Sequence, residues 1–135
     1  MQIGPHKIGR AEKPFIIAEL SANHGGSIDS AKEAILAAKN SSASAIKIQS
    51  YTPETMTIDS KKPDFLINDG LWKGYNLYQL YKEAYTPFEW HKELFDYANR
   101  IGITIFSSPF DETAVDLLES LDEPADKIAS FELID

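Results

Sequence analysis

A lysine that could bind an anion lies in the middle of the apolar segment 45–50. Strand alternation there places Lys47 and Gln49 on one face and Ile46 and Ile48 on the other. A buried ammonium group needs an anionic partner, because burying an unpaired charge is costly. The segment therefore indicates a site for a phosphate or carboxylate ligand. The alternative is an edge strand with Lys47 in water.

A carboxylate occupies a comparable place in the apolar segment 14–20. Glu19 could bind substrate hydroxyls or water, or act as a general base. It could instead form a structural ion pair with a lysine of a neighbouring strand. Both interpretations hold together if Glu19 lies near Lys47 and Lys127.

Two further segments add hydroxyls, a lysine and a carboxylate. Ser107 and Ser108 precede a predicted helix, whose N-terminus favours anions, although serines there could also be ordinary caps. Lys127, Ser130 and Glu132 lie near the end of the chain. Strict alternation places Lys127 opposite the other two, so all three converge only if the strand bends near residues 129–130.

The three histidines do not form a metal-binding motif by their spacing. His24, beside two glycines, is interpreted as a loop residue, His6 as part of a flexible start and His91 as an unremarkable residue on a helix. Phosphate-binding glycine motifs and hydrolase triads are also missing. A group of aromatic side chains is predicted to pack the connection 51–85 onto the protein or onto a partner. The alternative is that these rings stack against a carbohydrate. The group comprises Trp72, Tyr75, Tyr78, Tyr81, Tyr85, Phe88 and Trp90.

The elements that must position these side chains alternate along the chain. Strands are predicted at 14–20, 45–50, 103–108 and 125–130, after an irregular lead-in at 1–13. Helices are predicted from Ser27 or Asp29 to about Asn40, near 76–84, from a Thr86 cap to the residue before Gly102, and over 112–121. This order predicts an α/β fold with a parallel sheet, in which ligands bind at the C-terminal ends of the strands. The connection 51–85 is long enough to be a lid or a partner surface.

Length and composition limit the possibilities further. A (β/α)₈ TIM barrel needs about 250 residues, so the 135 residues are predicted to be its N-terminal half, a partial TIM-barrel domain of about four βα units. The net charge of −8 argues against nucleic-acid or membrane partners, and the chain has no cysteine. With no signal-peptide pattern at the start, the expectation is a soluble cytoplasmic protein.

Four blocks in order resemble the sialic acid synthase family. They are residues 18–26 (AELSANHGG), 46–49 (IKIQ), 106–110 (FSSPF) and 127–132 (KIASFE). Residues 51–57 (YTPETMT), 70–72 (GLW) and 86–91 (TPFEWH) look most like the branch that makes pseudaminic acid. The resemblance covers nearly the whole chain, from about residue 16 to residue 132.

The resemblance implies a barrel followed by an antifreeze-like domain, in a homodimer. Such enzymes condense phosphoenolpyruvate with an N-acetylated amino sugar, here a 2,4-diacetamido-2,4,6-trideoxy hexose, and release phosphate in nonulosonic acid and surface glycan biosynthesis. The resemblance also implies a divalent metal, Mn²⁺ or Mg²⁺, whose ligands lie outside this chain. By the same resemblance, substrate would be bound by Lys47, Gln49, Ser108, Lys127 and Ser130, and catalysis would use Glu19 and Glu132.

Several alternatives remain open. A synthase for N-acetylneuraminate or legionaminic acid would use another amino sugar. A related synthase of the 3-deoxy sugar acid type would share the chemistry, although its sequence blocks fit less well. An incomplete chain could instead act only as a binding or structural module, and this chain is expected to be inactive alone.

Overall fold

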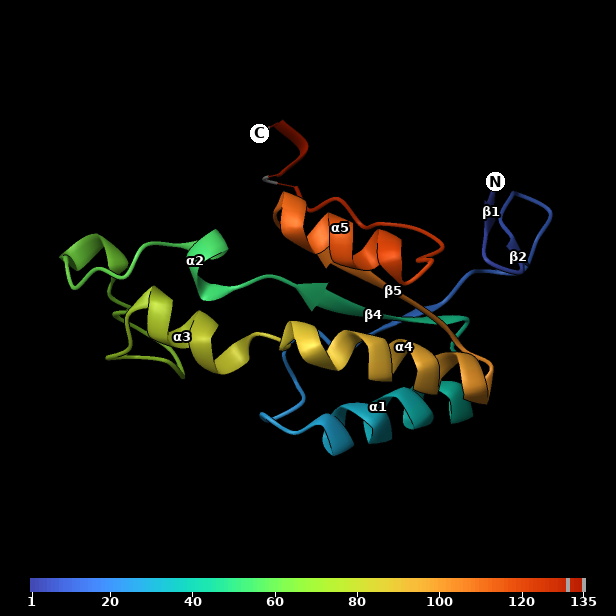
Figure 1. The fold of residues 1–135 in the computed structure, drawn as a ribbon, viewed down its shortest axis with the longest axis horizontal. Coiled ribbons are helices and arrows are strands. Elements are labelled where there is room, and N and C mark those ends of the chain that lie inside the picture. Colours follow the sequence, from blue (N-terminus) through green and yellow to red (C-terminus); the bar gives the residue numbers. More distant parts are fainter. Residues whose placement is uncertain (131, 135) are drawn as a thin grey trace.

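A three-stranded parallel sheet forms the centre of the molecule in a computed structural model that describes residues 1–130 and 132–134. Its order is β3-β4-β5, with β3 (Ile17–Glu19), β4 (Ala45–Ser50) and β5 (Thr104–Pro109). Each of these strands leads into a helix further along the chain (Figure 1). The predicted parallel α/β fold is therefore confirmed.

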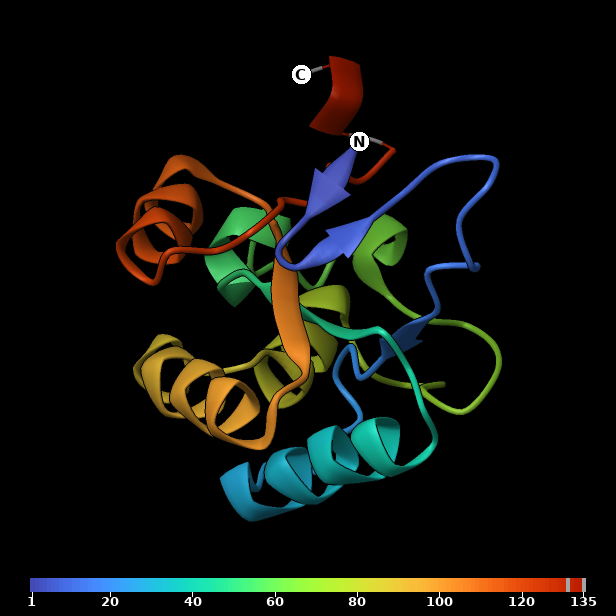
Figure 2. The same ribbon diagram turned by 90° about the vertical axis from the view of Figure 1, so that its right-hand side faces the viewer.

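Two long helices cover one face of this sheet and contact each other. They are α1 (Ile28–Asn40) and α4 (Phe88–Ile101), which lie side by side in both Figure 1 and Figure 2. A third helix, α5 (Glu112–Ser120), packs against β5. Alternate strand residues point toward the helices and form a buried apolar core, whose removal from water drives the packing. This core includes Ile35, Ile46, Ile48, Leu94, Phe95, Ile105 and Leu118.

The ends of the helices follow from local side-chain and backbone chemistry. Ser27 caps α1, since its side chain accepts a hydrogen bond from Ser30 N at 3.3 Å. Gly102 ends α4 in the left-handed conformation, with φ at +75°. The prediction of a Thr86 cap is wrong, because Pro87 occupies the N-cap position and Thr86 lies buried one residue earlier.

The N-terminal residues form a small hairpin instead of the expected irregular lead-in. β1 (Gln2–Ile3) pairs antiparallel with β2 (His6–Lys7), and Ile3 faces His6 across the turn. Gly4 permits this turn because its φ of +51° is unfavourable for other residues. The hairpin is too short to show period-two alternation, so the sequence pattern did not indicate it.

The connection between β4 and α4 lies beyond the C-terminal end of the sheet, as Figure 1 shows. It contains α2 (Pro53–Met56), the 3₁₀ turn η1 (Pro63–Phe65) and α3 (Leu77–Ala84). Asn76 caps α3 by accepting from Gln79 N at 2.8 Å. The predicted helix near 76–84 is therefore confirmed.

Within the described residues, no helix combines the length and hydrophobicity needed to cross a membrane.

The predicted fourth strand at 125–130 is wrong. These residues have no strand assignment, and the described chain ends in the short turn η2 (Glu132–Ile134). Only Lys127 N bonds to β5, donating to Ser107 O at 2.9 Å. The neighbouring Ser107 N–H, which a parallel strand would use, donates to the Glu123 side chain instead. A side-chain carboxyl thus takes the place of a strand carbonyl at this edge.

Candidate functional site

An ion pair joins β3 and β4 at the sheet face opposite α1 and α4. The register places Glu19 beside Lys47, and Lys47 Nζ contacts Glu19 Oε2. The Lys47 side chain is only 12% exposed, whereas Glu19 is 43% exposed, so the pair opens to solvent at its carboxylate end. The anionic partner that burial of Lys47 requires is therefore supplied within the chain. The alternative with Lys47 in water is wrong.

The turn after β3 holds the same carboxylate from its other side. Glu19 Oε1 accepts from Ser21 N at 2.9 Å and from Ser21 Oγ at 2.8 Å. Ser21 has a φ of +48°, a left-handed conformation that turns the chain directly after the strand. Because both carboxylate oxygens are held, Glu19 is oriented before any ligand arrives.

Gln49 and Ser108 extend this face toward the C-terminal ends of the strands. The register places them side by side on β4 and β5, and strand alternation puts them on the face of Lys47. Ser108 is 1% exposed, and its Oγ has no hydrogen-bond partner. A buried hydroxyl without a partner is uncommon in a fold, so Ser108 Oγ is free to bond to a ligand or water that enters this face. We call Glu19, Lys47, Gln49 and Ser108 the strand-end site.

The remaining predicted site residues follow β5 on its free edge. Lys127 is connected to the sheet through its backbone, and its side chain is exposed, as is Ser130. Glu132 lies in η2 with a buried Oε2 that has no partner. Among the described residues, none of these three side chains forms an ion pair with the strand-end site. Their roles stay predictions.

His91 is the residue that the sequence interpretation missed. It is fully buried on the helix side of the sheet, with Nε2 at 2.7 Å from Ser50 Oγ and Nδ1 at 3.0 Å from Pro87 O. Ser50 Oγ also lies 2.6 Å from Ser107 Oγ. Burial lowers the pKa of His91. Its spacing from Leu94, Phe95 and Ala98 is that of the buried helix face and could have revealed its position.

His24 lies in the loop after β3, as expected, but it is buried rather than exposed. Its Nδ1 accepts from Gly26 N at 3.1 Å, and its ring packs edge-on against Trp90 at 5.4 Å between centroids. Burial lowers the pKa of His24, which favours the neutral ring. The ring therefore fixes the loop that follows Glu19. Within the described parts of the chain, no three or more potential ligands cluster around a metal position.

An open pocket of about 670 Å³ adjoins this loop at the C-terminal side of the sheet. The loop 21–26 forms one wall, α3 forms another, and Tyr51 and Trp72 contribute aromatic rings. Tyr51 is itself buried and packs edge-on against Tyr81 and Phe110, which confirms the packing interpretation for Tyr81. Burial raises the Tyr51 pKa to about 12. Trp72, 41% exposed, leaves an aromatic surface open toward the pocket.

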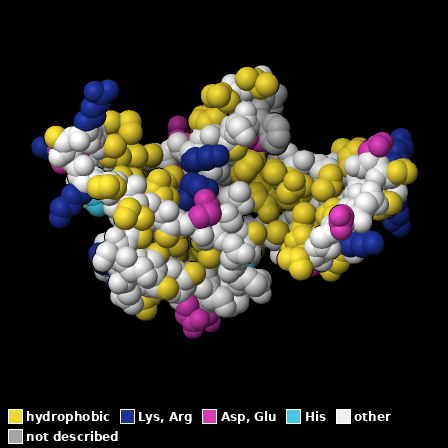
Figure 3. Space-filling view, turned by 180° about the vertical axis from the view of Figure 1, so that it is seen from behind, with side chains coloured by type: hydrophobic (Ala, Val, Ile, Leu, Met, Phe, Trp, Pro, Cys, Tyr) yellow, Lys and Arg dark blue, Asp and Glu magenta, His cyan; other side chains and the backbone are white. Residues whose placement is uncertain are grey.

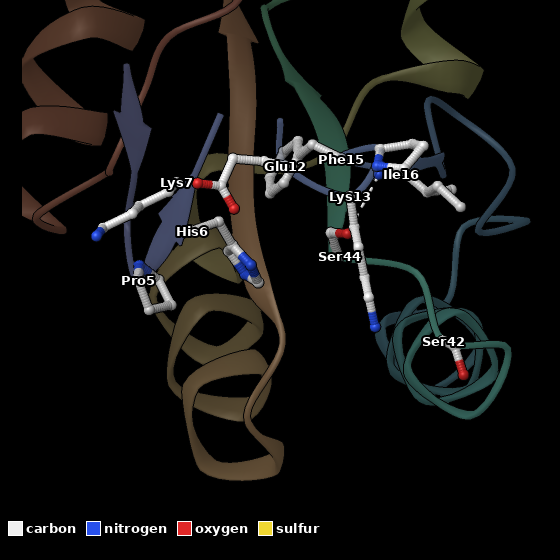
Figure 4. A pocket seen from close by; sticks show the side chains of 10 residues that line it. Pro5, His6, Lys7, Glu12, Lys13, Phe15, Ile16, Ser42 and Ser44 are labelled. Atoms are coloured by element: carbon white, nitrogen blue, oxygen red, sulfur yellow. Dashed lines mark hydrogen bonds between the residues drawn. The ribbon is translucent and has the colours of Figure 1, made fainter. Parts of the chain in front are cut away.

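Another pocket, of about 710 Å³, lies at the opposite end of the strands (Figure 4). Lys7 of the hairpin, Lys13 and Ser42 line it, and Ile16 N donates to Ser44 Oγ across it at 3.2 Å. In parallel α/β proteins, conserved chemistry lies at the other end of the strands. The polar contacts of this pocket instead hold the segment before β3 against the loop before β4.

The face seen from behind combines charge and apolar surface. In Figure 3, basic and acidic side chains lie together near its middle, with broad hydrophobic areas around them. Large apolar side chains that are exposed along the chain include Ile16, Ile17, Ile128, Leu133 and Ile134. An apolar surface of this extent is normally covered in a complete fold.

Parallel strands, helices on the outside and charged groups on the inner face define part of an α/β barrel. The chain belongs to the NeuB family, whose family model matches residues 34–135. It is 52% identical over all 135 residues to the pseudaminic acid synthase of Campylobacter jejuni, and 52% identical over 124 residues to that of Helicobacter pylori. It covers 39% and 36% of these proteins, respectively.

Solved structures support the same assignment of the fold. The N-acetylneuraminic acid (sialic acid) synthetase of Leptospira borgpetersenii, solved in complex with citrate, matches 99% of this chain with a TM-score of 0.82 at 28% identity. The spore coat polysaccharide biosynthesis protein spsE of Bacillus subtilis matches 98% with a TM-score of 0.73 at 33% identity. The chain covers 42% and 34% of those structures. The predicted family is therefore confirmed, and the chain represents part of the fold.

Proposed function

We propose that this chain supplies the phosphoenolpyruvate-binding part of a synthase that condenses phosphoenolpyruvate with an N-acetylated amino sugar. The product is a nine-carbon 2-keto sugar acid, and phosphate is released. The observation that carries the proposal is the strand-end site, where an almost buried ammonium and an unpartnered buried hydroxyl face the same side of the sheet. A trianionic substrate needs both kinds of donor.

The reaction balances with the groups available. C3 of phosphoenolpyruvate attacks the aldehyde carbon of the open-chain sugar, and the aldehyde oxygen takes a proton. Water adds at C2, and the tetrahedral intermediate loses phosphate through C–O cleavage. Lys47 and Lys127 bind the phosphate and carboxylate groups, while Ser108 and Ser130 donate hydrogen bonds to them. The positive charges of the two lysines offset the negative charge that is transferred to the departing phosphate.

The carboxylates have a separate role in this proposal. Glu19 is held by Ser21 and Lys47, so it can orient a water molecule or a sugar hydroxyl without reorganising. Glu132 supplies the second carboxylate for proton transfer, and Gln49, beside Ser108, contacts substrate on the same face. The described residues include no cluster that fits a divalent metal, so the metal of the full-length enzyme, Mn²⁺ or Mg²⁺, is proposed to be held by residues outside this chain.

The sugar is proposed to occupy the pocket between the loop 21–26 and α3. This pocket adjoins the ends of β3 and β4, and Trp72 offers it an open aromatic face. Aromatic rings pack well against the apolar faces of sugars. Of the possible sugars, a 2,4-diacetamido-2,4,6-trideoxy hexose is favoured, since identity to the pseudaminic acid synthases is 52%, against 36% to the N,N'-diacetyllegionaminic acid synthase of Legionella pneumophila.

The test uses the full-length protein that contains this chain, incubated with phosphoenolpyruvate, a divalent metal and one sugar at a time. Phosphate release and the product mass are measured. We expect turnover with the 2,4-diacetamido sugar. Turnover only with N-acetylmannosamine would transfer the assignment to N-acetylneuraminate synthesis, and turnover with arabinose 5-phosphate would transfer it to the 3-deoxy sugar acid class. Binding of phosphoenolpyruvate without turnover by any sugar would favour a binding module.

The proposal extends to the assembly and location of the whole protein. The exposed apolar side chains of the described chain are proposed to contact the remaining barrel, which is followed by an antifreeze-like domain in a homodimer. The reaction is proposed to take place in the cytoplasm, where phosphoenolpyruvate is available. Light scattering of the full-length protein tests the dimer, and a monomeric mass during turnover would contradict it.

A further inference from the structure

A fully buried chain of hydrogen bonds lies directly behind the strand-end site, on the helix side of the sheet. It joins Ser107 of β5, Ser50 of β4 and His91 of α4, and it ends at Pro87 O. Each of these three side chains has no measurable exposure. The groups are too enclosed to meet a ligand, so any role that they have must act through the elements that they join.

The donors and acceptors of this chain follow from chemistry. A carbonyl oxygen can only accept, so His91 Nδ1 carries the proton and donates it to Pro87 O. In the neutral ring, which burial favours, Nε2 then has a free lone pair and accepts from the Ser50 hydroxyl. Ser50 Oγ is left to accept from the Ser107 hydroxyl. In all three hydrogen bonds, the proton is therefore donated in the direction from β5 toward α4.

The chain connects backbone positions that neighbour three residues of the proposed substrate site. Ser50 follows Gln49 on β4, and Ser107 precedes Ser108 on β5. Ser107 O also accepts from Lys127 N at 2.9 Å. Adjacent strand residues point to opposite faces, so a displacement of either serine moves its neighbour on the ligand side by a similar amount.

We propose that His91 is a positioning residue for phosphoenolpyruvate binding. Through Ser50 and Ser107, it fixes the position of β4 relative to β5. That relative position in turn places Ser108 and Lys127 against Lys47. This inference rests on the proposed function. It assigns a role to a residue that touches no substrate, and it distinguishes His91 from the apolar residues of the same helix face, which supply packing alone.

Two substitutions of His91 separate the hydrogen bond to Ser50 from the one to Pro87. In His91→Gln, the longer amide places an acceptor near the former Nε2 position and restores the bond to Ser50. In His91→Asn, the shorter amide can still donate to Pro87 O, but it leaves Ser50 without an acceptor. We expect Asn to raise the KM for phosphoenolpyruvate about tenfold, whereas Gln restores it to within about threefold of the wild-type value.

The matched control is Leu94→Ala, one turn further along α4 in the same buried core. It removes packing but no hydrogen bond of the chain. We expect it to lower the melting temperature of the full-length protein at least as much as His91→Asn, with no change in KM. A KM that rises equally in both variants, or in neither, would overturn the inference, because a merely structural residue reduces the fraction of active enzyme and leaves KM unchanged.

A direct measurement supplements the kinetics. Nitrogen-15 spectra of histidine-labelled full-length protein should show the neutral His91 ring with its proton on Nδ1. A proton on Nε2 would contradict the donor order and overturn the inference. Calorimetry with phosphoenolpyruvate alone separates the two proposals: wild-type protein that binds and turns over while His91→Asn binds equally well overturns only the role of His91. Wild-type protein that does not bind at all overturns both.

Discussion

The two faces of the central sheet treat their buried polar groups differently. On the helix side, Ser107, Ser50 and His91 form a continuous chain of hydrogen bonds that ends at Pro87 O. On the opposite side, Ser108 Oγ is buried without a partner, and the pair of Glu19 and Lys47 opens to solvent at one end. A fold tolerates few unsatisfied buried groups, so the two faces differ in purpose. The satisfied face stabilises the sheet, and the unsatisfied face is prepared for a ligand.

The largest expected effect comes from the open face. Lys47→Met in the full-length protein should reduce kcat/KM for phosphoenolpyruvate by about 10³-fold, because it removes a positioned cation from a poorly solvated site. Phosphate release measures this. The control is Lys32→Met, which breaks an ion pair with Glu93 between α1 and α4 and should change kcat/KM by less than about twofold. Comparable losses in both variants would show that Lys47 only stabilises the fold.

Adjacent serines on β5 provide the sharpest test of the comparison. Ser107→Ala should lower the free energy of unfolding by about 1–2 kcal/mol, since it leaves Ser50 without its donor. Ser108→Ala should change it by less than about 0.5 kcal/mol, because the hydroxyl has no partner to lose. Urea titrations measure both values. Equal losses at the two positions would contradict the division between the faces.

The free edge of β5 should make stability depend on pH. Burial, with Asp126 nearby, raises the pKa of Glu123 to about 9. The folded chain therefore holds this proton more tightly than the unfolded chain, so the stabilisation is complete below about pH 4.5 and is lost as the pH rises toward 9. The carboxyl is only partly buried, so solvent screening reduces the nominal value of about 1.4 kcal/mol per pKa unit, and we expect a loss of about 1–2 kcal/mol across this range.

The substitution Glu123→Gln should remove that dependence, because the amide oxygen still accepts from Ser107 N and cannot ionise. The control is Glu119→Gln on the exposed side of α5, which should leave the slope unchanged. Thermal melting at pH 5, 7 and 9 measures the slope. An unaltered slope in Glu123→Gln would assign the pH dependence to another group.

The smallest effect is expected at the pocket beyond the open face. Trp72→Ala should raise the KM for the amino sugar about threefold to fivefold, the range of a single aromatic contact, and leave the KM for phosphoenolpyruvate unchanged. Leu71→Ala is the control, since the neighbouring leucine is fully exposed. If both KM values rise in Trp72→Ala, the pocket would be shared by the two substrates rather than dedicated to the sugar.

Local patterns were sufficient for the parts of the molecule that depend on one element and its neighbour. Alternation in β4 placed Lys47 and Gln49 on one face, and the parallel order brought Glu19 beside Lys47. The start of α1 was predicted at Ser27 or Asp29, and Ser27 is its N-cap, while the end of α4 followed from Gly102. To predict these features, it was enough to know the two-residue alternation of strands, the helix caps and the rule that parallel strands share an orientation.

The features that were missed depend on competition between distant groups. No local pattern shows that Glu123 displaces a strand from Ser107 N, because the segment 125–130 retains an apolar, strand-like sequence. The role of His91 likewise depends on Ser50 and Ser107, which are 41 and 16 residues away in the sequence. The helical spacing of His91 would have predicted its burial, but not its partners.

The carboxyl at the edge of β5 has a consequence for how the barrel is assembled. A strand that extends the sheet must first expel Glu123 from Ser107 N–H and insert its own carbonyl there. Until that exchange, the Ser107 amide is already occupied, so this edge of the sheet is less able to pair with a strand of another molecule. Glu123 thus protects this edge reversibly, and alkaline conditions, which ionise it, would favour its release into water, because burial disfavours the charged form more than the bond to Ser107 N–H favours it.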